Sequence, residues 1–291
     1  MFLRFILVFI LALAAVATGA APLRVVADIA PVQSLVAQVM GDVGAPDLLI
    51  PPRFAPHDAA LRPSQARMLQ GADIVFWVGP SLTPWLPKLL KNLAGNAEKI
   101  RLSDTPNLTL LPYRGGVLAE GTDPHLWLDP KNAQIMLGEI ANVLARKDPN
   151  NASLYRSNAA RGQAEIAAQA AQIQVNLAPL RNTGFLVYHD STQYFESRFS
   201  LTNKGVIVKG DANTPTAAGL AKAKSALATQ QIKCVFTEPQ FRATAAQTII
   251  AQTQAKIAVA DPLGSELPLG AGFYSQLLAD LAQSFSNCLS R

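Results

Sequence analysis

The chain contains three histidines, and we consider them first as candidate metal ligands. His57, His125 and His189 each lie in a predicted loop, and the neutral imidazole is the commonest metal ligand. A single loop histidine more often hydrogen-bonds to backbone. Two carboxylates, Glu238 and Asp261, follow predicted strands in the second half of the chain. Three imidazoles and one carboxylate form a four-coordinate site that suits Zn²⁺. No local spacing resembles a zinc finger or a His-Glu-x-x-His helix, so spacing alone does not establish the site.

The stretch Asp123–Pro130 holds His125 on stiff backbone. Pro124 has a fixed φ and pushes the aspartate before it towards an extended conformation. Asp129 and the proline that follows it predict the N-cap and the first position of a helix. His125 is therefore anchored just ahead of a helix, where it is well placed to be a ligand.

Apolar runs that alternate with helical patterns predict an α/β fold. The predicted strands cover residues 23–27, 47–50, 74–78, 184–188, 206–208, 234–237 and 257–260. The predicted helices between them include 31–40, 63–71, 85–93, 214–228, 243–253 and 272–287. This alternation indicates mostly parallel sheets with helices on both faces. Loops at the carboxyl ends of parallel strands line the crevice where ligands bind, so we expect the histidines and the two carboxylates to meet there.

The chain divides into two predicted α/β lobes, residues 21–150 and residues 181–291. The segment between them, residues 151–180, is rich in Ala and Gln and contains one glycine. It predicts a single long helix. We interpret this helix as a rigid strut that joins the lobes rather than as a core element.

Residues 1–20 predict a cleavable secretory signal, because a short basic start is followed by the apolar run Phe5–Val16 and then by small residues. No later stretch approaches the ~20 apolar residues that a membrane span requires. The formal net charge is +5, but Lys and Arg are scattered, so we expect no nucleic-acid partner. Since no cysteine lies near the N-terminus, we expect no lipid anchor. The sequence predicts a soluble periplasmic protein.

The chain has two cysteines, Cys234 in a predicted strand and Cys288 near the end of the last predicted helix. Export permits their oxidation. A disulfide between them would attach the last helix to the sheet and contribute roughly 4 kcal/mol by loop entropy. Two unrelated free thiols are the alternative.

Six stretches resemble, in order and over nearly all of the mature chain, the periplasmic zinc-binding protein of bacterial high-affinity zinc ABC importers. They are Pro56–Ser64, Gly71–Pro80, Asp123–Pro130, Val187–Asp190, Glu238–Gln240 and Asp261–Gly264. The Asp-Pro-His-x-Trp-x-Asp-Pro element is specific, whereas Pro-His-Asp alone is weak. The resemblance implies two α/β lobes joined by one long rigid helix, with the metal between the lobes. The cysteine pair also matches a disulfide that is common in this family.

The resemblance implies His57, His125 and His189 as metal ligands and places Asp261 at the carboxylate position. An aspartate before a proline is also a common helix cap, so this position is the less specific one. We interpret Glu238 as a carboxylate that orients an imidazole N–H rather than as a ligand.

Four further residues have expected supporting roles. Asp58 and Asp190 either orient an imidazole N–H in the same way or cap the helix that follows. Trp127 and Tyr188 are interpreted as packing residues that keep the site dry.

Two features depart from the family pattern. Many members carry a His- and Asp-rich loop before the Asp-Pro-His element, whereas residues 112–121 contain no histidine here. Members also often have an acidic residue just after Gly-Pro, where this chain has Ser81. A carboxylate from that position cannot complete the coordination, which leaves Asp261 or water.

The favoured hypothesis is a monomeric capture protein that binds Zn²⁺ and transfers it to a membrane permease powered by a separate ATPase. It is not an enzyme. A third imidazole, from His189, shifts the preference towards Zn²⁺ and away from Mn²⁺. The alternatives are a manganese or iron binder on the same scaffold, a secreted zinc hydrolase with Glu238 or Asp190 as base, and an adhesin of the same fold, which the missing lipid anchor disfavours.

Overall fold

In the computed structural model, each half of the chain forms a four-stranded sheet in which all neighbouring strands are parallel. The first sheet has the order β2-β1-β3-β4 and consists of β1 (Val25–Ala27), β2 (Asp47–Leu48), β3 (Ile74–Trp77) and β4 (Glu98–Arg101). The second has the order β6-β5-β7-β8 and consists of β5 (Phe185–His189), β6 (Asn203–Val208), β7 (Cys234–Thr237) and β8 (Lys256–Val259). The two sheets therefore share one topology, and the predicted two-lobed α/β fold is confirmed.

The structure describes residues 22–114, 121–208, 216–230, 232–241, 244–251 and 253–290. The predicted signal peptide, residues 1–20, lies outside these ranges, as does the predicted helix start at Thr214. Within the described ranges, no helix combines the length and the apolar character that crossing a membrane requires.

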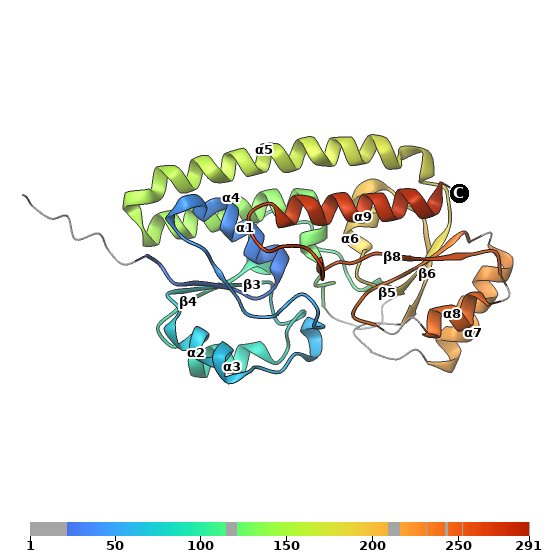
Figure 1. Ribbon diagram of the computed structural model, residues 1–291, viewed down its shortest axis with the longest axis horizontal. Coiled ribbons are helices and arrows are strands. Elements are labelled where there is room, and N and C mark those ends of the chain that lie inside the picture. Colours follow the sequence, from blue (N-terminus) through green and yellow to red (C-terminus); the bar gives the residue numbers. More distant parts are fainter. Residues whose placement is uncertain are drawn as a thin grey trace, which may run out of the picture.

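Helices lie on both faces of each sheet (Figure 1). In chain order they are α1 (Ala30–Met40), α2 (Pro63–Gly71), α3 (Leu86–Leu93), α4 (Pro130–Lys147), α5 (Ala152–Leu177), α6 (Gln193–Phe199), α7 (Ala217–Thr229), α8 (Thr244–Ile250) and α9 (Phe273–Leu289). One face of the first sheet is covered by α1 and α4 and the other by α2 and α3, while α7 and α8 lie beside the second sheet away from α9 (Figure 1). Parallel sheets require this double cover because both of their faces are apolar.

The long helix α5 extends over both sheets (Figure 1). Its 26 residues span about 39 Å. It contacts α1 and α4 in the first half and α9 in the second. Its buried residues are Tyr155, Asn158, Ala159, Gly162, Ile166, Ile173 and Leu177. The predicted long helix is confirmed, but it is not only a strut, because one of its faces belongs to the core shared by the two halves.

Strand β4 was not predicted. Its sequence, Glu98-Lys99-Ile100-Arg101, alternates half-buried and exposed residues at the edge of the first sheet. The central strand β3 is fully buried and apolar, and sequence patterns identify such strands readily. A charged edge strand lacks that signal, although its charges discourage pairing with other chains.

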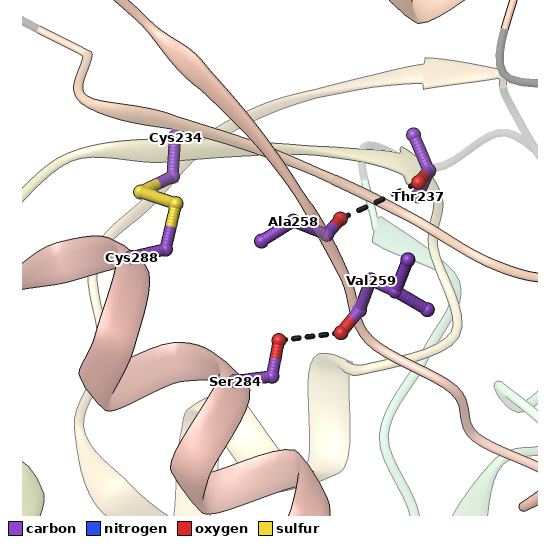
Figure 2. The surroundings of a disulfide bond; sticks show 6 residues. All are labelled: Cys234, Thr237, Ala258, Val259, Ser284 and Cys288. Atoms are coloured by element: carbon purple, nitrogen blue, oxygen red, sulfur yellow. Dashed lines mark hydrogen bonds between the residues drawn. A yellow bond between two sulfur atoms is a disulfide. The ribbon is translucent and has the colours of Figure 1, made fainter.

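The disulfide between Cys234 and Cys288 is present (Figure 2). It joins the first residue of β7 to the last turn of α9, with the two Cα atoms 6.1 Å apart. The Ser284 hydroxyl also donates a hydrogen bond to the Val259 carbonyl of β8 (Figure 2). The last helix is thus attached to both β7 and β8, and the alternative of two free thiols is wrong.

Candidate metal centre

His57 lies on a short 3₁₀ turn, Pro56–Asp58, in the connection between β2 and α2. Trp85 holds this turn, because its indole N–H donates a hydrogen bond to the Pro56 carbonyl at 2.9 Å. The His57 side chain is buried, with 9% of its surface exposed. The connection therefore presents one imidazole inward from the first lobe.

His125 directly precedes a 3₁₀ turn, Leu126–Leu128, that leads into α4. Asp129 is the N-cap of α4, and its side chain accepts a hydrogen bond from the Lys131 N–H at 2.8 Å, so the predicted cap is confirmed. Oδ1 of Asp123 lies 2.9 Å from the backbone nitrogen of His125 and 2.8 Å from its Nδ1. A carboxylate only accepts, so in the neutral ring Nδ1 carries the proton and Nε2 keeps its lone pair.

His189 is the last residue of β5, at the carboxyl end of a central strand. Its Nδ1 lies 3.0 Å from Oε1 of Glu238, which follows β7. The same oxygen accepts a hydrogen bond from the Ser191 hydroxyl at 2.7 Å. Nε2 of His189 is therefore also left as the lone-pair nitrogen, and the predicted contact between Glu238 and an imidazole is present.

The structure brings the three histidines together from the two halves of the chain. Their ring centroids are 5.7 Å apart for His57 and His125, 5.8 Å for His57 and His189, and 5.2 Å for His125 and His189. One ring nitrogen from each lies within 4.8 Å of the other two. A tetrahedral Zn²⁺ needs nitrogens roughly 3.4 Å apart, given Zn–N bonds of about 2.1 Å. Small ring movements would complete this geometry.

The histidines line a cavity of about 20 Å³. Most of its wall is apolar or aromatic, and the lining residues include Leu82, Trp127, Phe241, Pro262 and Leu263. A volume of ~10–15 Å³ is enough for one water-sized particle. The cavity therefore fits a single ion with few bound waters.

Asp261, the predicted carboxylate ligand, is not in the group that the three histidines form. Its two oxygens accept backbone N–H groups, from Leu263 at 3.0 Å and from Ser265 at 2.6 Å. The side chain of Gln240 also approaches it, at 3.4 Å. Asp261 therefore shapes the loop that supplies part of the cavity wall.

Neither Asp58 nor Asp190 caps the following helix, so that interpretation is wrong for both. Helix α2 begins after Arg62, and α6 begins after Thr192. Asp58 is exposed at the end of its turn. Asp190 instead pairs with Arg114 at 2.9 Å.

The pKa of Asp190 is raised to about 6, mainly by burial. The neighbouring carboxylates of Glu196 and Asp123 raise it further, while Arg114 lowers it. Acidic groups from both halves of the chain therefore lie close together beside the site, and the guanidinium of Arg114 offsets them.

Residues 25–288 match the sequence profile of the family described as ZnuA, zinc-uptake complex component A, periplasmic. The chain belongs to this family. The high-affinity zinc uptake system protein ZnuA of Paracoccus denitrificans is 36% identical, over 95% of this chain and 96% of that protein. A crystal structure of ZnuA superposes with a TM-score of 0.81 at 27% identity, and the match covers 92% of this chain and 99% of that one. FpvC from Pseudomonas aeruginosa, in complex with Mn²⁺, has a TM-score of 0.82 at 22% identity, over 93% and 99% of the two chains, and shares the fold.

Two residues of this ZnuA family chain have roles that the sequence did not reveal. Asp123 orients His125, and its position two residues before a histidine in a proline-stiffened turn was the available signal. Phe241 lies against His189, with the ring centroids 5.3 Å apart. The predicted packing role of Trp127 is confirmed, since it is fully buried and donates a hydrogen bond to the Pro262 carbonyl at 2.9 Å. Tyr188 packs in the core of the second half.

Proposed function

We propose that this protein captures Zn²⁺ in the periplasm and delivers it to the membrane permease of an ABC importer. The observation that carries the proposal is the convergence of His57, His125 and His189 from two lobes on one ion-sized cavity. Membership of the zinc-uptake family supports the same conclusion independently.

The chemistry of the donors favours zinc. Imidazole suits Zn²⁺, whereas Mn²⁺ prefers oxygen ligands. Asp123 and Glu238 each accept a hydrogen bond from the Nδ1–H of a histidine. Such carboxylate–imidazole pairs raise the basicity of the ligand and fix its orientation. Two of the three rings are thus oriented before the ion arrives, which lowers the entropy cost of binding.

The fourth position is best filled by water. Both oxygens of Asp261 already accept loop N–H groups, and Oε1 of Glu238 is shared between His189 and Ser191. A solvent ligand is also easily lost when the ion is transferred to another protein. The cavity of about 20 Å³ leaves no room for a peptide or ester beside the metal, which argues against the hydrolase alternative.

The proposed function requires export to the periplasm and a membrane permease that receives the ion. Residues 1–20 would direct export, after which the mature protein would carry one ion to the permease. The three ligands come from two lobes, so a change in the distance between the lobes would change the number of bound imidazoles. We infer that the permease induces release by separating the lobes.

A competition titration of the metal-free protein with Zn²⁺ and Mn²⁺ tests the proposal, using the wild type and His189→Ala. We expect one Zn²⁺ per wild-type chain, a strong preference for Zn²⁺ over Mn²⁺, and a large loss of Zn²⁺ affinity in the variant. A preference for Mn²⁺ would contradict the zinc assignment and favour the manganese alternative. Hydrolysis of model esters that depends on the metal would favour the enzyme alternative.

A further inference from the structure

Three ion pairs on or next to helix α6 hold the second lobe to the first. Arg114, from the first lobe, places Nε 2.9 Å from Oδ1 of Asp190 and a terminal nitrogen 2.6 Å from Oε2 of Glu196 on α6. The two carboxylates are only 13% and 3% exposed, and the guanidinium is 31% exposed. These two ion pairs are therefore mostly shielded from water.

In the third ion pair the arginine belongs to the second lobe and the carboxylate to the first. Arg198 of α6 makes a bidentate contact with Asp129 of the first lobe, with Nε–Oδ1 at 2.7 Å and a terminal nitrogen 2.6 Å from Oδ2. Asp129 is 4% exposed and also caps α4. Bidentate arginine–carboxylate contacts fix orientation as well as distance. We call Arg114, Asp190, Glu196, Arg198 and Asp129 the interlobe clamp.

Hydrogen bonds from α6 extend the clamp to the metal site. The Tyr194 hydroxyl accepts the Leu111 N–H at 2.9 Å and donates to the Asp123 carbonyl at 2.9 Å. Asp123 is the residue whose carboxylate orients His125. Asp190, which is also a member of the clamp, directly follows His189 in the sequence. One short helix thus connects the segments that carry two of the three histidines.

We propose that Arg114 and Arg198 are positioning residues for zinc, and that the interlobe clamp sets the distance between His125 and His189. The inference rests on the proposed function. Apparent affinity scales with the fraction of molecules in the binding-competent arrangement, so a clamp that favours this arrangement strengthens binding without touching the ion. Loss of Arg114 would leave Asp190 and Glu196 buried without their cation. Separated lobes would then be favoured, because separation returns both carboxylates to water.

The chain offers a matched control. Arg53 of the first half and Glu266 of the second form another ion pair between the halves, at 2.8 Å, but their side chains are 69% and 77% exposed. Exposed pairs contribute little because water and salt screen them. Arg53→Met removes a cation between the lobes without disturbing the clamp.

The first experiment measures the rate at which Zn²⁺ leaves the protein, by rapid mixing of the zinc-loaded full chain with an excess of chelator. We expect Arg114→Met and Arg198→Met to release zinc at least about tenfold faster than wild type, as truncation of one member of a buried charge pair acts mainly on dissociation. Arg53→Met should stay within about twofold. Arg114→Lys keeps the charge but not the two-carboxylate geometry, and it should fall between wild type and Arg114→Met.

A double-mutant cycle separates the clamp from a general loss of stability. The combined effect of Arg114→Met and Glu196→Gln on zinc release should be smaller than the product of the single effects, because both remove one interaction. Multiplicative effects, or release from Arg114→Met as slow as from Arg53→Met, would overturn the proposal.

A second experiment needs no zinc and therefore distinguishes failure of the clamp from failure of the proposed function. Spin labels are attached at Lys91→Cys on α3 and Lys222→Cys on α7, both exposed positions in opposite halves. We expect Arg114→Met to broaden or lengthen the distance distribution in the metal-free protein, and Arg53→Met to leave it unchanged. Identical distributions for wild type and Arg114→Met would overturn the clamp even if zinc binding is confirmed. A changed distribution in a chain that binds no zinc would support the clamp and contradict the function.

Discussion

Nδ1 of His189 lies 3.0 Å from the Glu238 carboxylate, and this contact determines which nitrogen of the ring faces the cavity. His189 comes from β5 and Glu238 follows β7, and these strands are neighbours in the second sheet. The sheet topology therefore supplies both the ligand and the group that orients it. His125 and Asp123 repeat the arrangement in the first lobe, within a single turn.

We expect Glu238→Gln to weaken zinc binding about 10- to 100-fold. Glutamine retains an oxygen that can accept the His189 Nδ1–H but lacks the negative charge that makes the ring more basic. Chelator competition on the purified metal-free variant measures the affinity. Glu266→Gln, an exposed glutamate of the same half, is the control and should match wild type. Wild-type affinity in Glu238→Gln would show that the carboxylate does not support the ligand.

Asp261→Asn distinguishes a ligand from a residue that shapes a loop. We expect zinc affinity to fall by less than about threefold, while the thermal unfolding temperature of the metal-free protein falls, since one of two backbone hydrogen bonds is lost. Affinity by competition and unfolding by circular dichroism are measured on the same samples. A loss of tenfold or more in affinity, with unchanged unfolding, would make Asp261 the fourth ligand.

Zinc binding should weaken sharply below about pH 6. The ordinary imidazole pKa is about 6.5, and a protonated ring cannot ligate, so protons compete with the ion at up to three sites. The affinity measured between pH 5 and pH 8 should fall towards the acid end. An affinity at pH 5 equal to that at pH 7.5 would refute coordination by histidine.

Asp28 should make the metal-free protein less stable as pH rises. This residue is fully buried after β1 and accepts N–H groups from Val78 and Ile29 at 2.8 Å each, but burial still raises its pKa to about 7 from 3.8. The folded state binds the proton more tightly than the unfolded state. The ionisation penalty is therefore absent below about pH 4, grows between pH 4 and 7, and is fully present above pH 7.

Asp28→Asn tests this directly, because the variant cannot ionise. The stability of the variant relative to wild type should therefore increase by about a few kcal/mol between pH 4.5 and pH 7.5, as the wild type loses stability and the variant does not. The exposed Asp42→Asn serves as the control and should show no such trend. Parallel stability curves for wild type and Asp28→Asn would contradict the raised pKa.

Local sequence patterns were enough to predict most of the strands and helices and the three candidate histidine ligands. Strands such as β3 are continuous apolar runs, and the boundaries of α2 at Pro63 and Gly71 follow from a proline at the first position and a glycine at the end. Three histidines after strands or in stiff turns indicated a shared crevice because parallel strands direct their carboxyl ends to one edge.

Other features depend on contacts that a sequence does not display. The ion pair between Arg114 and Asp190 joins residues that are 76 positions apart, and the sequence near either residue does not predict it. The buried face of α5 becomes apparent only when α4 and α9 pack against it. The engagement of Asp261 with its own loop likewise requires the turn geometry that follows Pro262.

The most direct test of the central claim is a crystal structure of the zinc-loaded protein with anomalous diffraction measured at the zinc absorption edge. We predict one strong peak bonded to Nε2 of His125, to Nε2 of His189 and to one ring nitrogen of His57, at about 2.1 Å from each nitrogen. A peak elsewhere in the molecule, with these three rings too far apart to share one ion, would contradict the account.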